Sequence, residues 1–170
     1  MTVDRTLAVQ KAEQLRKKCA TCDPFAIAKQ LGIEVRYMES FRQLKGMYAV
    51  IARNRFIFLN ANNSEEMNRI VCAHELGHDQ LHREAAKGEP LQEFSLWDLS
   101  GVREYEANLF AAQLLLQDEE ILSHALAGKT CAEIAALTET DPNLVALKTE
   151  CLKEKGFALN AQIYENKFLK

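Results

Sequence analysis

The chain has no long run of apolar residues and little net charge. Its longest uninterrupted apolar stretches are only a few residues long, whereas a membrane-spanning helix needs roughly 20. The formal net charge of −3 at pH 7 gives no electrostatic reason to expect binding to nucleic acid or to an anionic membrane. The N-terminal residues lack the apolar stretch of a secretory signal. We therefore expect a cytoplasmic protein without a membrane partner.

Cysteine and histidine are also scarce. Because the five cysteines are an odd number and no export signal is present, we expect free thiols rather than a disulfide framework. Cys19 and Cys22 have the spacing of half a zinc ribbon or of a redox pair, but no second such pair follows, which favours a structural role. The 170 residues, 48% of them apolar, are enough for one compact soluble domain.

One pentapeptide departs from this ordinary composition: residues 74–78 read His-Glu-Leu-Gly-His. On a helix, His74 and His78 project from one face and can bind a single ion. Two neutral imidazoles suit Zn²⁺, and Glu75 can act as the base for a water bound to that ion. The alternative is a solvated helix with two surface histidines.

The flanking residues predict a helix over about 64–83. Asn63 is a suitable N-cap, and Glu66 can complete a capping box. Gly77 costs about 1 kcal/mol relative to Ala inside a helix, which favours close packing against another element. Four apolar residues recur at helical spacing beside the histidines: Met67, Ile70, Val71 and Leu81. These features predict a half-buried helix that can support a metal site.

A hydrolytic zinc site needs a third protein ligand, and residues 103–112 form a strongly helical stretch that supplies candidates. Glu104 and Asn108 share a face because they are four positions apart. Glu106 points about 200° away from Glu104, so both cannot face the same ion. We favour Glu104 over Glu106 as the ligand, with Asn108 hydrogen-bonding the outer nitrogen of one histidine.

A longer pattern surrounds the pentapeptide. It continues with Leu81-His82 and, 26 residues after His78, with Glu104-x-Glu106-Ala107-Asn108-x-Phe110-Ala111. On the N-terminal side stand residues 23–33, Lys45-Gly46-x-Tyr48 and residues 56–60. Together, over roughly residues 20–125, these segments resemble the ImmA/IrrE family of metallo-endopeptidases. One departure is Leu115-Leu116-Gln117, where that family usually has Leu-Met-Pro.

The resemblance implies a zincin-like fold of the α+β class with one Zn²⁺ per chain. The two histidines and the first glutamate of the later helix bind zinc in this family, which favours His74, His78 and Glu104 as ligands. It also implies an endopeptidase with a specific protein substrate, a transcriptional repressor or another regulator, rather than an enzyme of bulk digestion.

Periodicity predicts a mostly helical chain with a small three-stranded sheet packed on the motif helix. The predicted strands are 33–38, 46–52 and 55–60, and the predicted helices of this part are 3–19, 24–31, 64–83 and 101–117, with a polar loop at about 84–100. We expect residues 1–125 to form the catalytic core and residues 126–170 a helical extension packed on it. Helices at 131–137 and 142–155 have the outline of a helix-turn-helix, but their acidic residues favour a cap over DNA binding.

The expected reaction is zinc-assisted peptide hydrolysis, in which Glu75 takes a proton from water and returns it to the leaving amine. Tyr48, Tyr105 and His82 are candidate oxyanion donors, and His82 is also a candidate hydrogen-bond partner beside the metal site. An extended substrate is expected to add to the edge of the last strand, which comprises Phe56, Ile57, Phe58, Leu59 and Asn60.

Two other functions are compatible with the same residues. One is a non-catalytic, metal-stabilised module that binds and sequesters a regulator, and the other is a DNA-binding regulator acting through residues 131–155. Direct nucleic-acid binding is not expected because that segment has few basic residues. Glu75 separates the first alternative from a peptidase, since a structural metal site does not need it.

Overall fold

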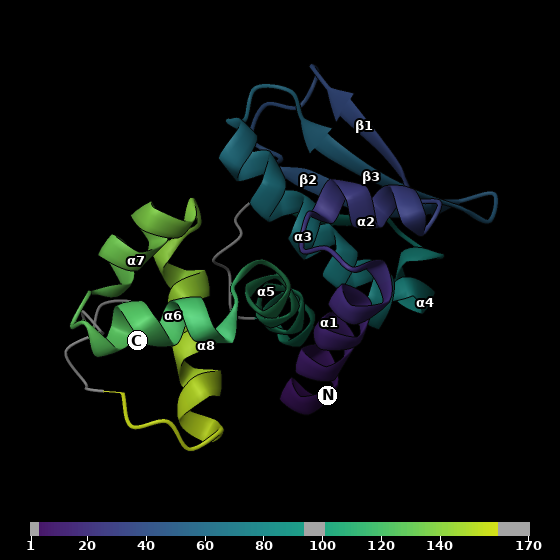
Figure 1. Ribbon diagram of the computed structural model, residues 1–170. Helices are drawn as coiled ribbons and strands as arrows, with labels where there is room; N and C mark the ends of the chain where they lie inside the picture. Colours follow the sequence, from purple (N-terminus) through teal and green to yellow (C-terminus); the bar gives the residue numbers. More distant parts are fainter. Residues whose placement is uncertain (1–3, 94–100, 160–170) are drawn as a thin grey trace. The chain divides into compact units, whose positions relative to one another are not determined.

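The computed structural model describes residues 4–93 and 101–159, which divide into two compact units (Figure 1). The first unit, residues 1–115, contains α1 (Arg5–Cys19), α2 (Pro24–Gln30), β1 (Glu34–Met38), β2 (Gly46–Ile51), β3 (Asn54–Asn60), α3 (Glu65–Leu81), α4 (Arg83–Ala86), β4 (Leu91–Glu93) and α5 (Val102–Leu115). The second unit, residues 116–170, contains α6 (Asp118–Leu126), α7 (Cys131–Thr138) and α8 (Pro142–Glu154). The predicted α+β fold with more helix than strand is confirmed.

The sheet has the strand order β1-β3-β2-β4. β3 pairs in parallel with β1 and antiparallel with β2, while β2 also pairs antiparallel with β4. The prediction of three strands is therefore wrong: a fourth strand forms inside the segment read as a loop, of which residues 94–100 lie outside the described part. β4 is only three residues long and partly polar, so it has no alternating pattern and is defined by its pairing with β2.

The same topology corrects the predicted substrate edge. β3 is hydrogen-bonded to a neighbour on both sides, so residues Phe56 to Asn60 cannot accept an added strand. β3 is internal because it also pairs in parallel with β1, for example Val35 opposite Ile57. The spacing of the hairpin in the sequence does not reveal this second pairing. Among the described strands, β1 and β4 lie at the edges.

The hairpin between β2 and β3 turns through Ala52 and Arg53, one residue earlier than predicted. Both have a positive φ, 49° and 68°, as a two-residue turn of type I′ requires. Ile51 then pairs with Asn54, and this register places Tyr48 opposite Ile57.

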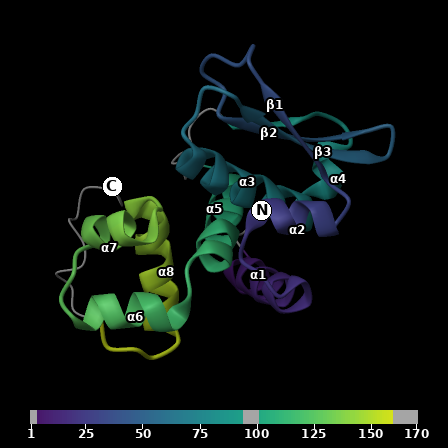
Figure 2. The same cartoon turned by 45° about the horizontal axis from the view of Figure 1, so that its top comes forward.

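Helix α3 is the centre of the first unit. It contacts β2 and β3 on one side and α5 on another, and α2 and α3 lie along one face of the sheet (Figure 1 and Figure 2). Every residue from Ile70 to Asp79 is buried, which is typical of a helix inside a core rather than on a surface. The helix is capped by Ser64 rather than Asn63, because the Ser64 hydroxyl accepts a hydrogen bond from the Met67 backbone N–H at 3.1 Å.

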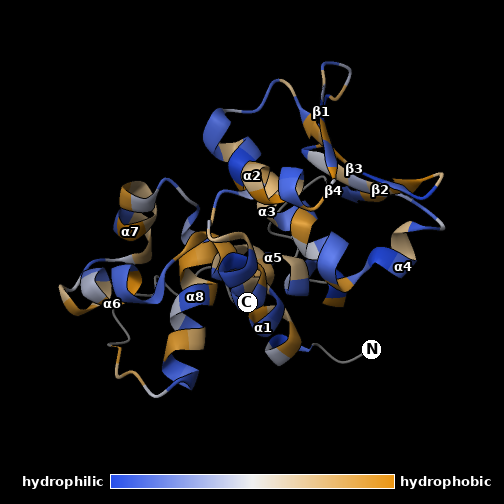
Figure 3. Cartoon of the chain, turned by 45° about the vertical axis from the view of Figure 1, so that its right-hand side comes forward, coloured by the Kyte–Doolittle hydropathy of each residue, from blue (hydrophilic) through white to orange (hydrophobic). Residues whose placement is uncertain are grey.

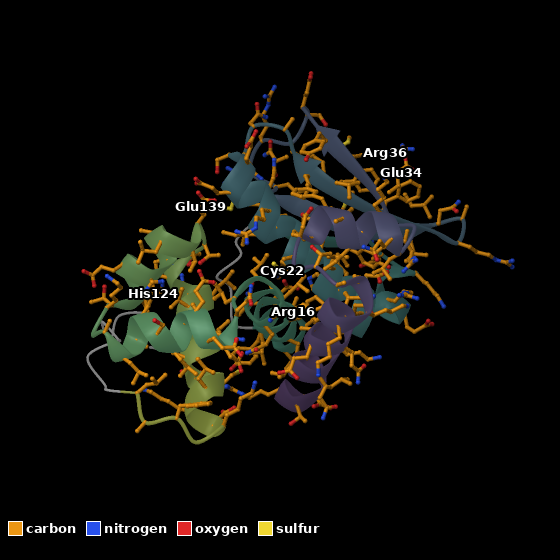
Figure 4. The ribbon with its side chains drawn as sticks, in the orientation of Figure 1. Arg16, Cys22, Glu34, Arg36, His124 and Glu139 are labelled. Atoms are coloured by element: carbon orange, nitrogen blue, oxygen red, sulfur yellow. The ribbon has the colours of Figure 1, made fainter. Side chains whose placement is uncertain are left out.

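Helix α1 packs against α5. Its buried positions are Ala8, Ala12, Leu15 and Cys19, which recur at the spacing of one helix face. Hydrophobic and hydrophilic residues accordingly interleave along α1 (Figure 3). Arg16, on α1, donates a hydrogen bond to the carbonyl oxygen of Gln113 at 3.2 Å (Figure 4). None of the five cysteines forms a disulfide, as predicted.

The second unit is helical and contains an ion pair whose lysine is buried. Thr130 and Glu133 form a capping box at the start of α7, and Glu139 ends that helix in the left-handed conformation. Lys148 of α8 is buried and lies 2.5 Å from an Asp118 carboxylate oxygen. The division between the units falls after Leu115, whereas the sequence placed it after residue 125. The packing of a helical cap on the core stays a prediction.

Within the described residues, no helix is both long and apolar enough to cross a membrane.

Candidate metal centre and active site

Three potential ligand atoms converge between α3 and α5. His74 Nε2 and His78 Nε2 lie 3.1 Å apart, and Glu104 Oε2 lies 3.2 Å from the first and 3.5 Å from the second. Both histidines are buried, and Glu104 is half-buried. The structure thus brings together the three residues that the sequence proposed as ligands, a group whose geometry can hold a metal ion.

The outer nitrogens of both rings face hydrogen-bond partners. His74 Nδ1 lies 3.0 Å from Asn108 Oδ1, and an amide oxygen can only accept, so the proton of this ring belongs on Nδ1. His78 Nδ1 lies 3.0 Å from His82 Nδ1. Because His82 Nε2 faces the Glu106 carboxylate at 2.9 Å and must donate to it, its Nδ1 accepts from His78. Both Nε2 lone pairs consequently point at Glu104 Oε2.

Such a cluster of electron pairs favours a cation. Lone pairs of three acceptor atoms within 3.5 Å repel one another, and a positive ion among them removes that repulsion. A tetrahedral Zn²⁺ with bonds of about 2.0–2.1 Å separates its ligand atoms by about 3.3 Å. The observed separations therefore fit zinc. Two imidazoles and one carboxylate are also a ligand set of catalytic zinc sites, which keep a fourth position open.

The protonation of the site suits a cation as well. Burial lowers the pKa of His78 to about 4, so its imidazole is neutral and can act as a ligand at pH 7. Glu104 is 29% exposed, so water reaches its carboxyl group. It would supply the anionic ligand beside the two neutral imidazoles.

Glu75 lies fully buried on α3 beside the first residue of β2. A Cβ built on Gly46 would overlap Val71 Cγ1 and lie 2.9 Å from Glu75 Oε1. Only glycine at this position lets the strand approach the Glu75 carboxylate so closely. The sequence reasoning assigned no role to Gly46, although a glycine inside a strand often marks a close approach.

Asp79 is the centre of a second buried cluster that the sequence did not reveal. The Tyr48 hydroxyl donates to it at 2.7 Å, and Arg55 and Arg83 donate at 3.2 and 2.8 Å. Arg55 also donates to the carbonyl oxygen of Leu31. Burial, and then the hydrogen bond to Asp79, raise the pKa of Tyr48. Tyr48 is thus bound to a structural carboxylate, which does not favour the oxyanion role considered for it.

Tyr105 and Glu106, the other candidates, and several further charged residues lie away from the three converging ligand atoms. The Tyr105 hydroxyl accepts a hydrogen bond from Arg5. Glu106, the alternative ligand, faces His82 rather than the histidine pair. His124, the fourth histidine, belongs to α6 in the second unit (Figure 4). Glu34 and Arg36 form a surface ion pair on β1 at 2.7 Å (Figure 4).

Residues 28–149 match the family described as IrrE N-terminal-like domain, Peptidase_M78. The chain belongs to this family. The match spans most of the chain and includes every residue of the His74, His78 and Glu104 cluster. The resemblance to ImmA/IrrE metallo-endopeptidases is thereby confirmed, and the family supports a metallopeptidase-like role.

A phage protein also matches this member of the ImmA/IrrE family, and the match covers most of both chains. This relative is "Uncharacterized immunity region protein 2" of Bacillus phage phi105, which is 33% identical over 144 residues. The aligned part covers 84% of this chain and 89% of the phage protein.

Proposed function

We propose that this ImmA/IrrE family member is a zinc-dependent endopeptidase that hydrolyses a peptide bond in a specific regulator, such as a transcriptional repressor. The observation that carries the proposal is the convergence of His74 Nε2, His78 Nε2 and Glu104 Oε2 at separations of 3.1 to 3.5 Å. These residues would hold one zinc ion, which supplies a Lewis acid and lowers the pKa of water when bound.

The protein's own groups supply the proton transfer. Glu75 takes the proton of the attacking water and returns it to the leaving amine. Its carboxylate is buried and packed against Gly46, which limits its movement and excludes bulk water from its side of the site. Asn108 and His82 hold the two imidazole rings in the tautomer with Nε2 facing the centre.

The sheet offers one edge near Glu75. Gly46, which borders Glu75, pairs with Glu93 of β4, and β4 is at the edge of the described sheet. An extended substrate would add to β4 rather than to the internal strand β3. Main-chain hydrogen bonds along β4 would then orient the scissile bond relative to the Glu75 carboxylate.

The choice of a regulator as substrate has two supports. The ImmA/IrrE family is one of peptidases, which implies a protein substrate. The phi105 relative is described as an immunity region protein, and immunity depends on regulation rather than on bulk digestion. We therefore expect cleavage of few proteins.

The test compares the zinc-loaded wild type with Glu75→Gln in a total cell extract. New peptide N-termini are identified by mass spectrometry, and casein serves as an unspecific substrate. We expect new termini in one or a few proteins with the wild type alone and no digestion of casein. Equal termini in both samples would contradict peptidase activity, and capture of a regulator by both without cleavage would support the sequestering alternative.

A further inference from the structure

A line of hydrogen bonds leads from His78 to the start of α1. His78 Nδ1 lies 3.0 Å from His82 Nδ1, and His82 Nε2 lies 2.9 Å from Glu106 Oε2. The other carboxylate oxygen, Glu106 Oε1, accepts from the backbone N–H of Asp4 at 2.6 Å. The side chains of His82 and Glu106 are 8% and 13% exposed, so the line is largely removed from water. It joins α3, α5 and the first turn of α1.

We propose that Glu106 is a positioning residue for the metal centre, which acts through His82 to set the tautomer and ring orientation of His78. This inference rests on the proposed function, since it requires His78 to be a ligand. Glu106 itself does not face the three converging ligand atoms and is not proposed to touch the ion or the substrate.

The roles along the line follow from the chemistry of a carboxylate. Ionised Glu106 has only acceptor oxygens, so both of its neighbours must donate. His82 must therefore carry its proton on Nε2, which leaves Nδ1 as an acceptor. His78 then donates from Nδ1 and presents its Nε2 lone pair to the metal centre. The Glu106 carboxylate, which contacts His82 and not His78, thereby determines which nitrogen of His78 can bind a cation.

The first turn of α1 holds this carboxylate in place. The Asp4 backbone N–H binds Glu106, and the next residue, Arg5, hydrogen-bonds the Tyr105 hydroxyl and lies 5.6 Å from the centre of its ring. Asp4, the N-cap of α1, and Arg5, its first residue, thus contact two consecutive residues of α5. Because Glu106 binds on both oxygens, its side chain has little freedom to turn away from His82.

Three residues of helix α5 consequently contribute to the proposed metal centre. Glu104 supplies a ligand atom, Asn108 faces His74, and Glu106 reaches His82, the residue that follows α3. A glutamine at position 106 cannot reproduce this arrangement. Its amide nitrogen would face a donor at one of the two positions where Glu106 presents an oxygen.

The test is Zn²⁺ affinity of the full chain, measured by competition with a chromophoric chelator. The variants are Glu106→Gln, Glu106→Ala, His82→Ala and the double variant Glu106→Ala/His82→Ala. We expect Glu106→Ala to weaken zinc binding by about 10- to 100-fold, and Glu106→Gln, which keeps the side-chain shape, to weaken it as well. Because Glu106 acts through His82, the double variant should bind no more weakly than His82→Ala alone.

Two further measurements separate positioning from a general loss of structure. Glu66→Gln removes the same negative charge from an exposed residue in the first turn of α3. This variant should leave the affinity for Zn²⁺ unchanged. A proton–nitrogen correlation spectrum of the histidine rings should show His82 protonated at Nε2 in the wild type, and a changed protonation pattern in Glu106→Gln.

Wild-type Zn²⁺ affinity in both single Glu106 variants would overturn the proposal. So would a double variant that binds Zn²⁺ more weakly than His82→Ala by the full factor that Glu106→Ala causes in the wild type. Failure of the wild type to bind Zn²⁺ would instead contradict the proposed function, so the two can fail separately.

Discussion

Gly77 of α3 and Ala107 of α5 touch where the two helices cross. A Cβ built on Gly77 would lie 3.0 Å from Ala107 Cα and 3.1 Å from its carbonyl oxygen. Helix α5 also carries Glu104 and Asn108, so this contact sets how closely the third ligand approaches the histidines. The cost of a glycine inside α3 is explained by the close approach of α5 that it permits.

Gly77→Ala should therefore weaken the centre. The substitution gains about 1 kcal/mol in helix propensity, but the obstructing atoms are mostly backbone of a packed helix and can yield only by moving α5. We expect a net destabilisation of about 1 kcal/mol and a lower Zn²⁺ affinity, measured by urea unfolding and chelator competition. Gly88→Ala is the control, because its Cβ would meet only Ala85 O at 3.8 Å. A more stable Gly77→Ala with unchanged affinity would refute this explanation.

Gly46→Ala tests the contact between β2 and the proposed base. The added methyl group would overlap Val71 and press on the Glu75 carboxylate, so we expect a loss of about 1–3 kcal/mol in stability. Cleavage of the substrate should fall sharply, while zinc content stays at the wild-type level because His74, His78 and Glu104 are not displaced. Retention of full cleavage would show that the position of Glu75 does not depend on Gly46.

Tyr48→Phe distinguishes a structural from a catalytic hydroxyl. Removing the 2.7 Å hydrogen bond to buried Asp79 should lower the free energy of unfolding by about 1–3 kcal/mol. Zinc content and cleavage rate should not change. An oxyanion donor, by contrast, contributes a factor of about 10²–10³ to the rate, so a loss of that size in a folded variant would restore the catalytic interpretation of Tyr48.

Because of the Asp118–Lys148 pair, the free energy of unfolding should depend on pH in the acidic range. Burial raises the pKa of Asp118, but hydrogen bonds from Lys148 and Lys155 lower it by more. A carboxyl whose folded-state pKa is depressed stabilises the fold above its unfolded pKa of about 4, and this contribution is lost as pH falls through the folded pKa. Urea unfolding at several pH values should show this loss below about pH 4 in the wild type, and a smaller one in Asp118→Asn.

The same pair predicts a mutational asymmetry at pH 7. Asp118→Asn removes the carboxylate next to a lysine that is 1% exposed, and we expect a cost of about 3 kcal/mol. The double variant Asp118→Asn/Lys148→Met should recover most of that stability, because an apolar side chain replaces the buried ammonium. A double variant as unstable as Asp118→Asn alone would contradict this account.

The part of the site that was accessible from sequence depends on local periodicity. His74 and His78 share a face of α3 because they are four positions apart, and the same spacing pairs Glu104 with Asn108 on α5. The structure places Glu104 Oε2 within 3.5 Å of both histidines. Long helices with caps and apolar stripes are recognisable in the same way, and their predicted ends differ from the observed ones by at most two residues.

What could not be predicted depends on contacts between distant segments. The parallel pairing of β1 with β3 made β3 internal, and β4 exists only through its pairing with β2. The proximity of Gly46 to Glu75, and of Asp4 to Glu106, likewise joins residues that are far apart in the chain. Periodicity describes one element at a time, so none of these relationships was visible in the sequence.

The most direct test of the metallopeptidase account is the zinc content of the purified chain after reconstitution, for the wild type, Glu104→Gln and Glu75→Gln. The account predicts about one zinc per chain in the wild type and in Glu75→Gln, and its loss in Glu104→Gln. Absence of zinc from the wild type, or equal zinc in Glu104→Gln, would contradict a centre built from His74, His78 and Glu104.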